Sequence, residues 1–266
     1  MRLIFGMTAY NRDDTFTKAF SALTKSVRGR FPICVLMDKH DAGKDMEAYA
    51  NQSTLARDRF TIRRSKKPLG CAGAHRELFQ WMFDEEGADA IVLVEDDGVV
   101  APDFCDVMVE MLERFKDDEE VFSTTAWFSH RDTTEMPDPT TLVKRKWFTC
   151  HTFGTWRRVW DDIQSAGGVR GVHWRSTKRE PDEGQNFAEL LRWDYDDGSW
   201  AIPFNHIYRG DRYEVATLLP RMKDIGVKGT FMVPELHSKI MATPFWSADL
   251  ESFPNVEDLH IEPDRS

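Results

Sequence analysis

The sequence lacks paired cysteines. Its four cysteines, Cys34, Cys71, Cys105 and Cys150, lie far apart in the chain, and none belongs to a CxxC motif. This spacing argues against both a zinc knuckle and a disulfide framework. We therefore expect free thiols buried in the core.

The sequence also lacks an apolar run long enough to cross a bilayer. The first residues, MRLIFGMTAYNR, enter a strand-like segment at once, with no separate apolar signal region or cleavage site. From both observations we expect a cytoplasmic protein without a membrane span.

Basic residues are in the minority, since 35 lysines and arginines stand against 45 acidic residues and the formal net charge is -10. Nucleic-acid affinity comes largely from cations that neutralise phosphates, so this balance argues against a phosphate backbone as the main partner. The clear basic patches, at 61–67 and 142–147, are expected to be solvated faces.

Two common nucleotide-binding motifs are missing as well. No GxxxxGK[ST] occurs, which argues against a P-loop kinase, and TAYNR at 8–12 is not the GxGxxG of a dinucleotide-binding protein. The small residues at 70–74, which begin with Gly70 and precede a helix, still allow a nucleotide to approach the backbone and an anion to meet helix N–H groups.

What the chain does have is ample apolar content, 41%, arranged in alternating strands and helices. Apolar or β-branched runs predict four strands, at 2–10, 31–38, 58–65 and 90–97. Amphipathic stripes predict helices over 72–83 and after Pro102, and a helix at 155–168 is expected to stop at two glycines. Strands are expected at 121–129 and 212–220, a turn-rich segment at 146–154, a loop at 169–184 and short helices at 185–192 and 200–208. This rhythm predicts an α/β fold with a mixed, mainly parallel sheet flanked by helices.

The strand at 90–97 ends in three consecutive acids, Glu95, Asp96 and Asp97. Carboxylates at the carboxyl end of a parallel strand lie where open α/β sheets bind ligands, and they suit a hard divalent cation whose other ligands come from a substrate diphosphate. The alternative is a turn of solvated acids in which Asp97 and Gly98 reverse the chain.

The run VLVEDDGVVAPDF at 92–104 resembles the DXD-type metal-binding segment of GT-A glycosyltransferases, particularly the inverting N-acetylglucosaminyltransferase I type and related family 2-like transferases. TAYNR at 8–12, FPICVLMD at 31–38, STTAWF at 123–128 and WFTCHTFGTWRRVWDDI at 147–163 follow that family in order and spacing. The resemblance is continuous from residue 1 to about 163. It implies a single GT-A (Rossmann-like) catalytic domain at 1–242, with a nucleotide-sugar-binding half at 1–130 and an acceptor-binding half at 131–242, before a tail at 243–266.

The resemblance also implies site residues. Asp97 would bind Mn²⁺ or Mg²⁺, with Asp96 and His237 as further candidate metal ligands; His206 is also late enough in the chain to be considered, although packing is the commoner role of a lone histidine. The residues implied at the nucleotide sugar are Thr8, Arg12, Asp38, Gly70, Arg76, Glu95 and Asp96. A strand-end cap remains the alternative for Asp38, and a surface salt bridge for Arg12.

The proton acceptor for the attacking hydroxyl is implied to be an acid of RWDYDDGSW at 192–200. Asp197 is the first choice, followed by Asp196 and Asp194, with Glu189 as a further candidate. An exposed acidic turn is the alternative. The aromatic residues Trp127, Trp147, Phe148 and Trp156 are able to form a wall for a sugar face, but core packing is expected for most of them.

Taken together, the resemblance implies a metal-dependent glycosyltransferase that uses a nucleotide-diphosphate sugar, UDP-linked, and inverts the anomeric centre. The acceptor stays open among a glycan, a lipid-linked saccharide, a protein, a small molecule and a modified nucleobase. A nucleotidyltransferase and a catalytically silent nucleotide-sugar or glycan-binding protein are the alternatives.

Overall fold

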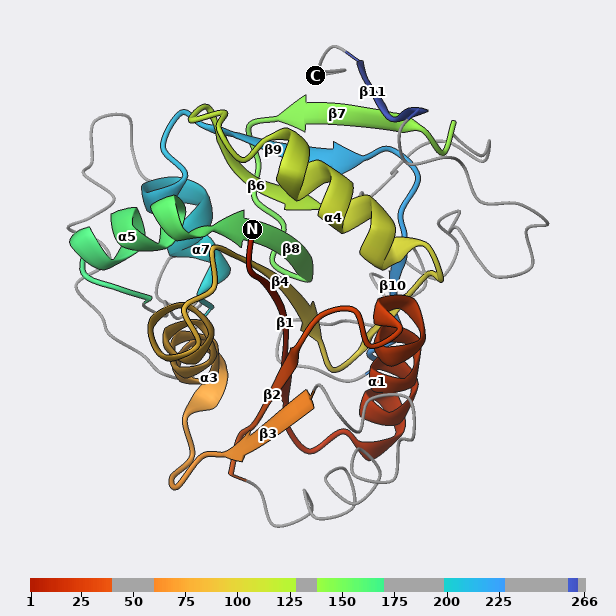
Figure 1. Cartoon of the computed structure of the whole chain (residues 1–266). Helices are drawn as coiled ribbons and strands as arrows, with labels where there is room; N and C mark the ends of the chain where they lie inside the picture. Colours follow the sequence, from red (N-terminus) through yellow and green to blue (C-terminus); the bar gives the residue numbers. More distant parts are fainter. Residues whose placement is uncertain (40–59, 128–137, 170–198, 228–257, 263–266) are drawn as a thin grey trace.

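The computed structural model describes residues 1–39, 60–127, 138–169, 199–227 and 258–262 (Figure 1). Eleven strands lie within these residues, and nine of them form one sheet. The nine are β1 (Leu3–Ala9), β2 (Ile33–Met37), β3 (Phe60–Arg64), β4 (Ala90–Glu95), β6 (Val121–Thr125), β7 (Thr141–Arg145), β8 (Thr152–Trp156), β9 (Tyr213–Thr217) and β11 (His260–Glu262). The other two, β5 (Gly98–Val100) and β10 (Met222–Asp224), form an antiparallel pair.

The strand order in the large sheet is β11-β7-β9-β6-β8-β4-β1-β2-β3. β1 to β4 pair in parallel, as does β6 with β9, while β8 runs antiparallel to both of its neighbours and β7 runs antiparallel to β9. The predicted mixed and mainly parallel sheet is therefore confirmed. The carboxyl ends of β2, β1, β4 and β6 and the start of β8 all lie at the same edge.

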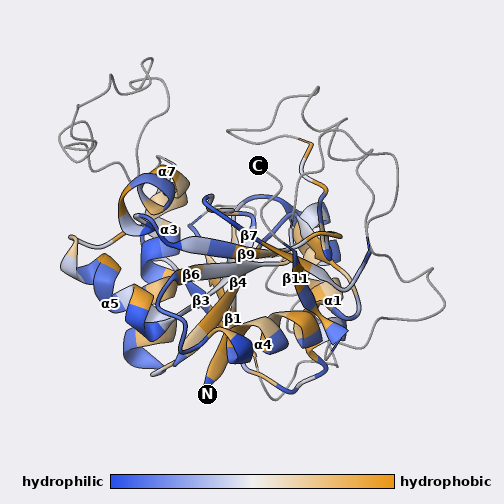
Figure 2. Ribbon diagram, turned by 90° about the horizontal axis from the view of Figure 1, so that it is seen from above, coloured by the Kyte–Doolittle hydropathy of each residue, from blue (hydrophilic) through white to orange (hydrophobic). Residues whose placement is uncertain are grey.

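Helices cover both faces of the sheet. Figure 1 shows α1 and α3 on opposite sides of β1 and β2, and Figure 2 shows the apolar β1 between helices that carry polar residues on their outer sides. The helices are α1 (Asp13–Val27), α3 (Gly70–Gln80), which continues into the π-helical turn η1 (Trp81–Glu85), α4 (Phe104–Arg114), α5 (Arg157–Ser165), α7 (Ala201–Pro203) and the π-helical turn η3 (Phe204–Tyr208).

Several helix predictions are confirmed. α4 follows Pro102, and its predicted apolar stripe, from Phe104 to Phe115, is buried. α5 ends just before Gly167 and Gly168, whose φ angles of 103° and 79° lie in the region that side chains disfavour. Within the described residues, no helix is both long and apolar enough to traverse a bilayer.

The segment at 146–154 differs from its prediction, because it is not only a turn. β8 begins at Thr152, and all five of its residues are buried. A strand covered on both faces shows no alternation of polar and apolar residues, so the sequence pattern hides it. β7 and the three-residue strands β5, β10 and β11 were not predicted either, and such short strands are too brief to show a period.

The expected tail at 243–266 contains β11, which pairs in parallel with β7 through His260 and Thr141. The rest of that segment, apart from Asp258 and Leu259, lies outside the described residues, as does the helix expected at 185–192. The domain boundary at 242 stays a prediction, but the described end of the chain belongs to the sheet.

The cysteines are free thiols. Cys34 and Cys105 are buried as predicted, whereas Cys71 and Cys150 are partly exposed. Burial raises the pKa of the Cys34, Cys71 and Cys105 thiols to about 12, so they stay protonated and unreactive near neutral pH.

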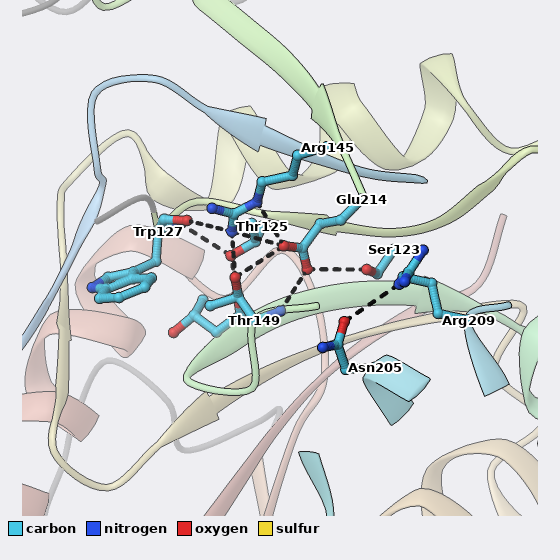
Figure 3. A network of polar contacts seen from close by, with 9 residues as sticks. Ser123, Thr125, Trp127, Arg145, Thr149, Asn205, Arg209 and Glu214 are labelled. Atoms are coloured by element: carbon cyan, nitrogen blue, oxygen red, sulfur yellow. Dashed lines mark hydrogen bonds and ion pairs between the residues drawn. The ribbon is translucent and has the colours of Figure 1, made fainter. Parts of the chain in front are cut away.

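A buried polar network ties β6, β7 and β9 together (Figure 3). At its centre is Glu214 of β9, whose side chain is fully buried. Oε1 of Glu214 accepts hydrogen bonds from Nη2 and Nε of Arg145, at 2.7 and 3.1 Å, and from Oγ1 of Thr149 at 2.9 Å. Oε2 accepts from the Thr149 amide at 2.9 Å and from Oγ of Ser123 at 3.1 Å. The buried charge is thus fully paired, as a buried carboxylate requires.

Candidate active site

The candidate site lies where β1, β2 and β4 end. Thr8 of β1 is opposite Glu95 of β4, and the Asp38 amide donates to the carbonyl oxygen of Ala9 at 2.9 Å. Thr8, Asp38 and Glu95 are therefore brought to one edge of the sheet, because parallel neighbours end on the same side.

Asp96 and Asp97 are buried, with residue exposures of 7% and 8%. They are not a solvated turn, because Arg12 reaches both. Its Nη1 contacts Oδ2 of Asp97 directly and lies 3.4 Å from Oδ1 of Asp96, and the amide of Tyr10 donates to Oδ2 of Asp96 at 2.9 Å. Burial and the charge of Asp97 still raise the pKa of Asp96 to about 7. Asp96 and Asp97 are thus two neighbouring buried acids that share one cationic partner, Arg12.

Glu95 meets two histidines. Nδ1 of His151 lies 3.4 Å from Oε2 of Glu95, and Nε2 of His75 lies 3.9 Å from Oε1. Burial disfavours the His151 imidazolium, but the ion pair with Glu95 and the charges of Asp224 and Asp97 outweigh it and raise the pKa of His151 to about 9. His151 is therefore a cation at neutral pH.

His75 behaves in the opposite way. Its Nδ1 lies 2.7 Å from the carbonyl oxygen of Cys71, and because a carbonyl only accepts, this nitrogen carries the proton. Burial lowers the pKa of His75 to about 4, so the ring is neutral and Nε2 presents a lone pair toward Glu95. The ring also stacks on Trp200, at 4.4 Å between centroids.

Asp224 is a fourth carboxylate that the sequence analysis did not identify. It ends β10 opposite Gly98, is 2% exposed, and places Oδ2 3.9 Å from Nδ1 of His151. Burial and the charge of Asp97 raise its pKa. The four carboxyl groups face two cationic side chains, Arg12 and His151, so acids outnumber cations in the site.

Gly226 lies against these acids. The amide of Ile225 donates to the backbone oxygen of Asp97 at 2.9 Å, and the amide of Gly226 donates to Oδ1 of Asp224 at 2.8 Å. A Cβ at position 226 would overlap Oδ2 of Asp97 and lie 3.1 Å from Oδ1 of Asp224. The absent side chain therefore leaves space between two carboxylates. Asp224 and Gly226 follow the strand expected at 212–220, and no motif in the sequence indicates that they lie beside the acids of β4.

Asp38 acts at least as a cap. Its Oδ1 accepts from the amides of Lys39 and Leu69 and from Oγ of Ser65, at 2.7, 2.9 and 2.8 Å, and Oδ2 accepts from the Gly70 amide at 3.0 Å. The capping alternative left open by the sequence is thus present in the structure. A carboxylate has about two acceptor sites on each oxygen, so Oδ2 keeps one for a ligand.

The remaining candidates divide into two groups. Arg76 is half-buried on α3, and His206 is exposed on η3, where its ring lies 3.4 Å from Nδ2 of Asn205. The others lie outside the described residues: Asp194, Asp196, Asp197, Glu189 and His237.

A divalent cation fits the chemistry of the acid cluster in part. The buried Asp96 and Asp97 and the nearby Asp224 supply hard oxygen ligands. Among the residues that the structure describes, however, no three Asp, Glu, His or Cys side chains converge on one metal position. A cation here would need ligands from a bound substrate or from elsewhere in the chain, as Mg²⁺ does when it keeps only one or two protein carboxylates.

The raised pKa of His151 predicts a pH effect on the metal-free protein. A folded-state pKa of about 9 against an ordinary value of 6.5 means that the imidazolium stabilises the fold fully below pH 6.5 and that this contribution is lost as the pH rises through 9. After allowance for solvent screening we expect a loss on the order of 1 to 2 kcal/mol.

Melting temperatures in EDTA between pH 7.5 and 9.5 measure this loss, and that window lies above the Asp96 pKa of about 7. His151→Gln should flatten the curve. Parallel curves for the two proteins would contradict the assignment.

Comparison with known proteins adds a family and a fold. A model of the family described as Glycosyl transferase family 2 matches residues 5–175. No curated protein matches the chain. The family match spans every described residue placed in the acid cluster except Asp224 and Gly226.

Three solved structures illustrate the structural likeness. S. aureus TarS 1-349 in complex with UDP-GlcNAc aligns over 91% of this chain and 64% of its own, with a TM-score of 0.51 and 10% identity. The mannosyltransferase PcManGT from Pyrobaculum calidifontis, in complex with GDP-Man and Mn²⁺, aligns over 63% and 47%, with a TM-score of 0.45 and 13% identity. Glucosyl-3-phosphoglycerate synthase from Mycobacterium tuberculosis, in complex with Mn²⁺, UDP and phosphoglyceric acid, aligns over 60% and 57%, with a TM-score of 0.40 and 14% identity.

At 10% identity the likeness to TarS concerns the fold alone. The alignment with TarS covers nearly the whole chain and confirms the fold class implied by the sequence. The chain spans between 47% and 64% of the lengths of these three structures.

Proposed function

The chain belongs to glycosyl transferase family 2, and from this premise we propose that it transfers a sugar from a nucleotide-diphosphate sugar to an acceptor hydroxyl. The observation that carries the proposal is the buried pair Asp96 and Asp97 at the end of β4, with the Arg12 guanidinium in contact with both carboxylates. Buried acids that exceed their counter-charges favour a bound cation, and a guanidinium beside them is suited to a diphosphate.

We propose that the nucleotide lies over the ends of β2 and β1. The open acceptor site on Oδ2 of Asp38 is able to receive an imide N–H of a base, and Gly70 allows the backbone to approach closely. Arg12 would exchange its carboxylate contacts for the diphosphate, with Thr8 and Arg76 as further contacts and Glu95 and Asp96 toward ribose and sugar. UDP is the proposed nucleotide, supported by the imide of uracil and by the UDP-GlcNAc bound to TarS, which has the same fold.

We propose Mn²⁺ or Mg²⁺ as the cofactor, with Asp97 as direct ligand, Asp96 beside it and His237 as a candidate from outside the described residues. When bound, the ion neutralises charge on the departing nucleoside diphosphate. The chain's own part is to hold the carboxylates in place, through the Tyr10 amide at Asp96 and the Ile225 amide at the Asp97 backbone.

Asp197 is proposed as the base that takes the acceptor proton, with inversion at the anomeric carbon. Trp200 stacks on His75, whose Nε2 faces Glu95, so the end of the 192–200 segment is anchored beside the site. Three residues span at most about 11 Å, which keeps Asp197 within reach of that anchor. Asp196, Asp194 and Glu189 remain the alternatives.

The proposed donor contacts all come from the first 97 residues, which supports a nucleotide-sugar-binding half at 1–130. An acceptor-binding half at 131–242 completes the proposed domain.

A thermal-shift screen of nucleotide sugars with and without Mn²⁺ tests the function. A ligand that binds only the folded state at 100 times its Kd stabilises by about 2.7 kcal/mol, so a matching UDP-sugar with Mn²⁺ should raise the melting temperature by several degrees. The nucleoside monophosphate is the control, since it lacks the diphosphate. No shift with any nucleotide sugar would contradict the proposal, and a shift without metal-dependent release of UDP would indicate a silent binding protein.

A further inference from the structure

Five side chains follow one another along the ligand edge of the sheet. In strand order they are Asp38 after β2, Arg12 after β1, Glu95 at the end of β4, His151 before β8 and Trp127 after β6. If the proposed function holds, the base lies at Asp38 and the diphosphate at the β4 acids. On that basis we place the transferred sugar and then the acceptor further along the same edge, over His151 and Trp127.

The rings of Trp127 and His151 lie close together at this end of the site. Their ring centroids are 5.2 Å apart at 53°. The His151 side chain is 32% exposed, and Trp127 packs one part of its ring on the core while remaining partly exposed. Figure 3 shows the indole of Trp127 pointing away from Arg145 and Glu214, so the ring takes no part in the buried polar network.

The backbone of Trp127 is held on both sides. Its amide donates to Oγ1 of Thr125 at 3.1 Å, and its carbonyl oxygen accepts from Nη2 of Arg145 at 3.4 Å. The Arg145 guanidinium is in turn fixed by Glu214, at 2.7 Å. A partly exposed indole on so constrained a backbone is pre-organised, which lowers the entropy cost of binding.

The same network holds His151. Thr149, two residues earlier, is bound to Glu214 through its amide and hydroxyl, and Thr152, the next residue, has its carbonyl oxygen bound by Oγ1 of Thr125. Glu214 thus reaches both rings through their backbones, without touching either ring.

We propose that Trp127 is the acceptor platform of this enzyme, and that the acceptor is a carbohydrate whose pyranose ring stacks on the indole while His151 donates a hydrogen bond to a ring hydroxyl. This assignment rests on the proposed function. The indole face is electron-rich and apolar, and it matches the C–H face of a sugar, whereas an imidazole N–H is a donor suited to a hydroxyl. Glu214 is a positioning residue that acts through the backbones of Trp127 and His151.

The test follows indole N–H resonances of ¹⁵N-labelled protein while methyl glucoside, galactoside, mannoside and N-acetylglucosaminide are titrated, with and without UDP and Mg²⁺. The Trp127 resonance is identified by its loss in Trp127→Phe. We expect at least one saccharide to shift it saturably. Trp127→Ala should weaken that saccharide at least tenfold, with UDP–Mg²⁺ affinity changed less than threefold. Ile261→Ala is the control, because Ile261 is a 42% exposed apolar residue on β11, at the outer edge of the sheet, and should leave both affinities unchanged.

Glu214→Gln separates positioning from stability. It should shift the Trp127 resonance of the free protein and weaken the saccharide, whereas Thr155→Val, which removes a buried hydrogen bond to the Phe122 carbonyl at 2.9 Å, should do neither.

The proposal is overturned if UDP–Mg²⁺ binds and no saccharide moves the Trp127 resonance, or if Trp127→Ala weakens nucleotide and saccharide equally. If UDP–Mg²⁺ fails to bind while saccharides still shift the Trp127 resonance, the proposed donor is wrong and the saccharide-binding role of Trp127 is supported.

Discussion

Asp97→Asn is expected to remove metal-linked nucleotide-sugar binding and to lower sugar transfer by about 10²- to 10⁴-fold. The substitution keeps the shape of a side chain that is buried against Arg12 and removes only its charge. Because the charge of Asp97 helps to raise the pKa of Asp96, its loss relieves repulsion, and the metal-free protein should melt no lower than the unaltered one.

The measurements are Mn²⁺ titrations of nucleotide-sugar binding and turnover, beside a melting curve in EDTA. Asp106→Asn is the control, since Asp106 forms a partly exposed pair with Arg30 at 2.5 Å, and surface pairs contribute little. Retained manganese dependence in Asp97→Asn would refute the proposed metal ligand.

Gly226→Ala is expected to produce almost as large a loss by a different route. The added methyl group would overlap Oδ2 of Asp97 and crowd Oδ1 of Asp224, so the Asp97 carboxylate has to move. We expect metal-linked nucleotide affinity to fall at least tenfold, and overpacking to cost about 1 to 3 kcal/mol of stability.

Gly87→Ala is the matched control for stability. Gly87 has a φ of 66°, and no atom lies within 4 Å of the position that an added methyl group would take, so alanine there brings backbone strain but no new contact. It should lower the melting temperature and leave metal-linked binding intact. If Gly226→Ala binds the nucleotide sugar with Mn²⁺ as well as the unaltered protein, the space beside Asp97 has no role in binding.

The parallel half of the fold was predictable because its signals are local. β1, β2 and β4 are continuous apolar runs, and Glu95 follows one of them directly, so the place of the acids at a strand end could be predicted from a few adjacent residues. The burial of Asp96 and the contact of both acids with Arg12 could not, because they depend on which strands become neighbours.

The antiparallel half was harder for the same reason. β8 is buried on both faces and lacks a period, and β10 has only three residues, so neither His151 nor Asp224 stood out. His151 reaches Glu95 and Asp224 only through long-range pairing of strands. Asp38 could not be assigned from the sequence for a different reason. One carboxylate can cap a helix and still accept a hydrogen bond from a ligand, and the sequence does not distinguish these two roles.

The pairing of β11 with β7 has a consequence for how the molecule meets its neighbours in concentrated solution. β7 is five residues long and, left uncovered, would offer its backbone as a template for another chain. β11 covers β7 and becomes the edge strand of the described sheet. With three residues it is too short for stable pairing with another chain. Truncation of the chain before residue 258 would remove β11, expose the edge of β7 and favour self-association.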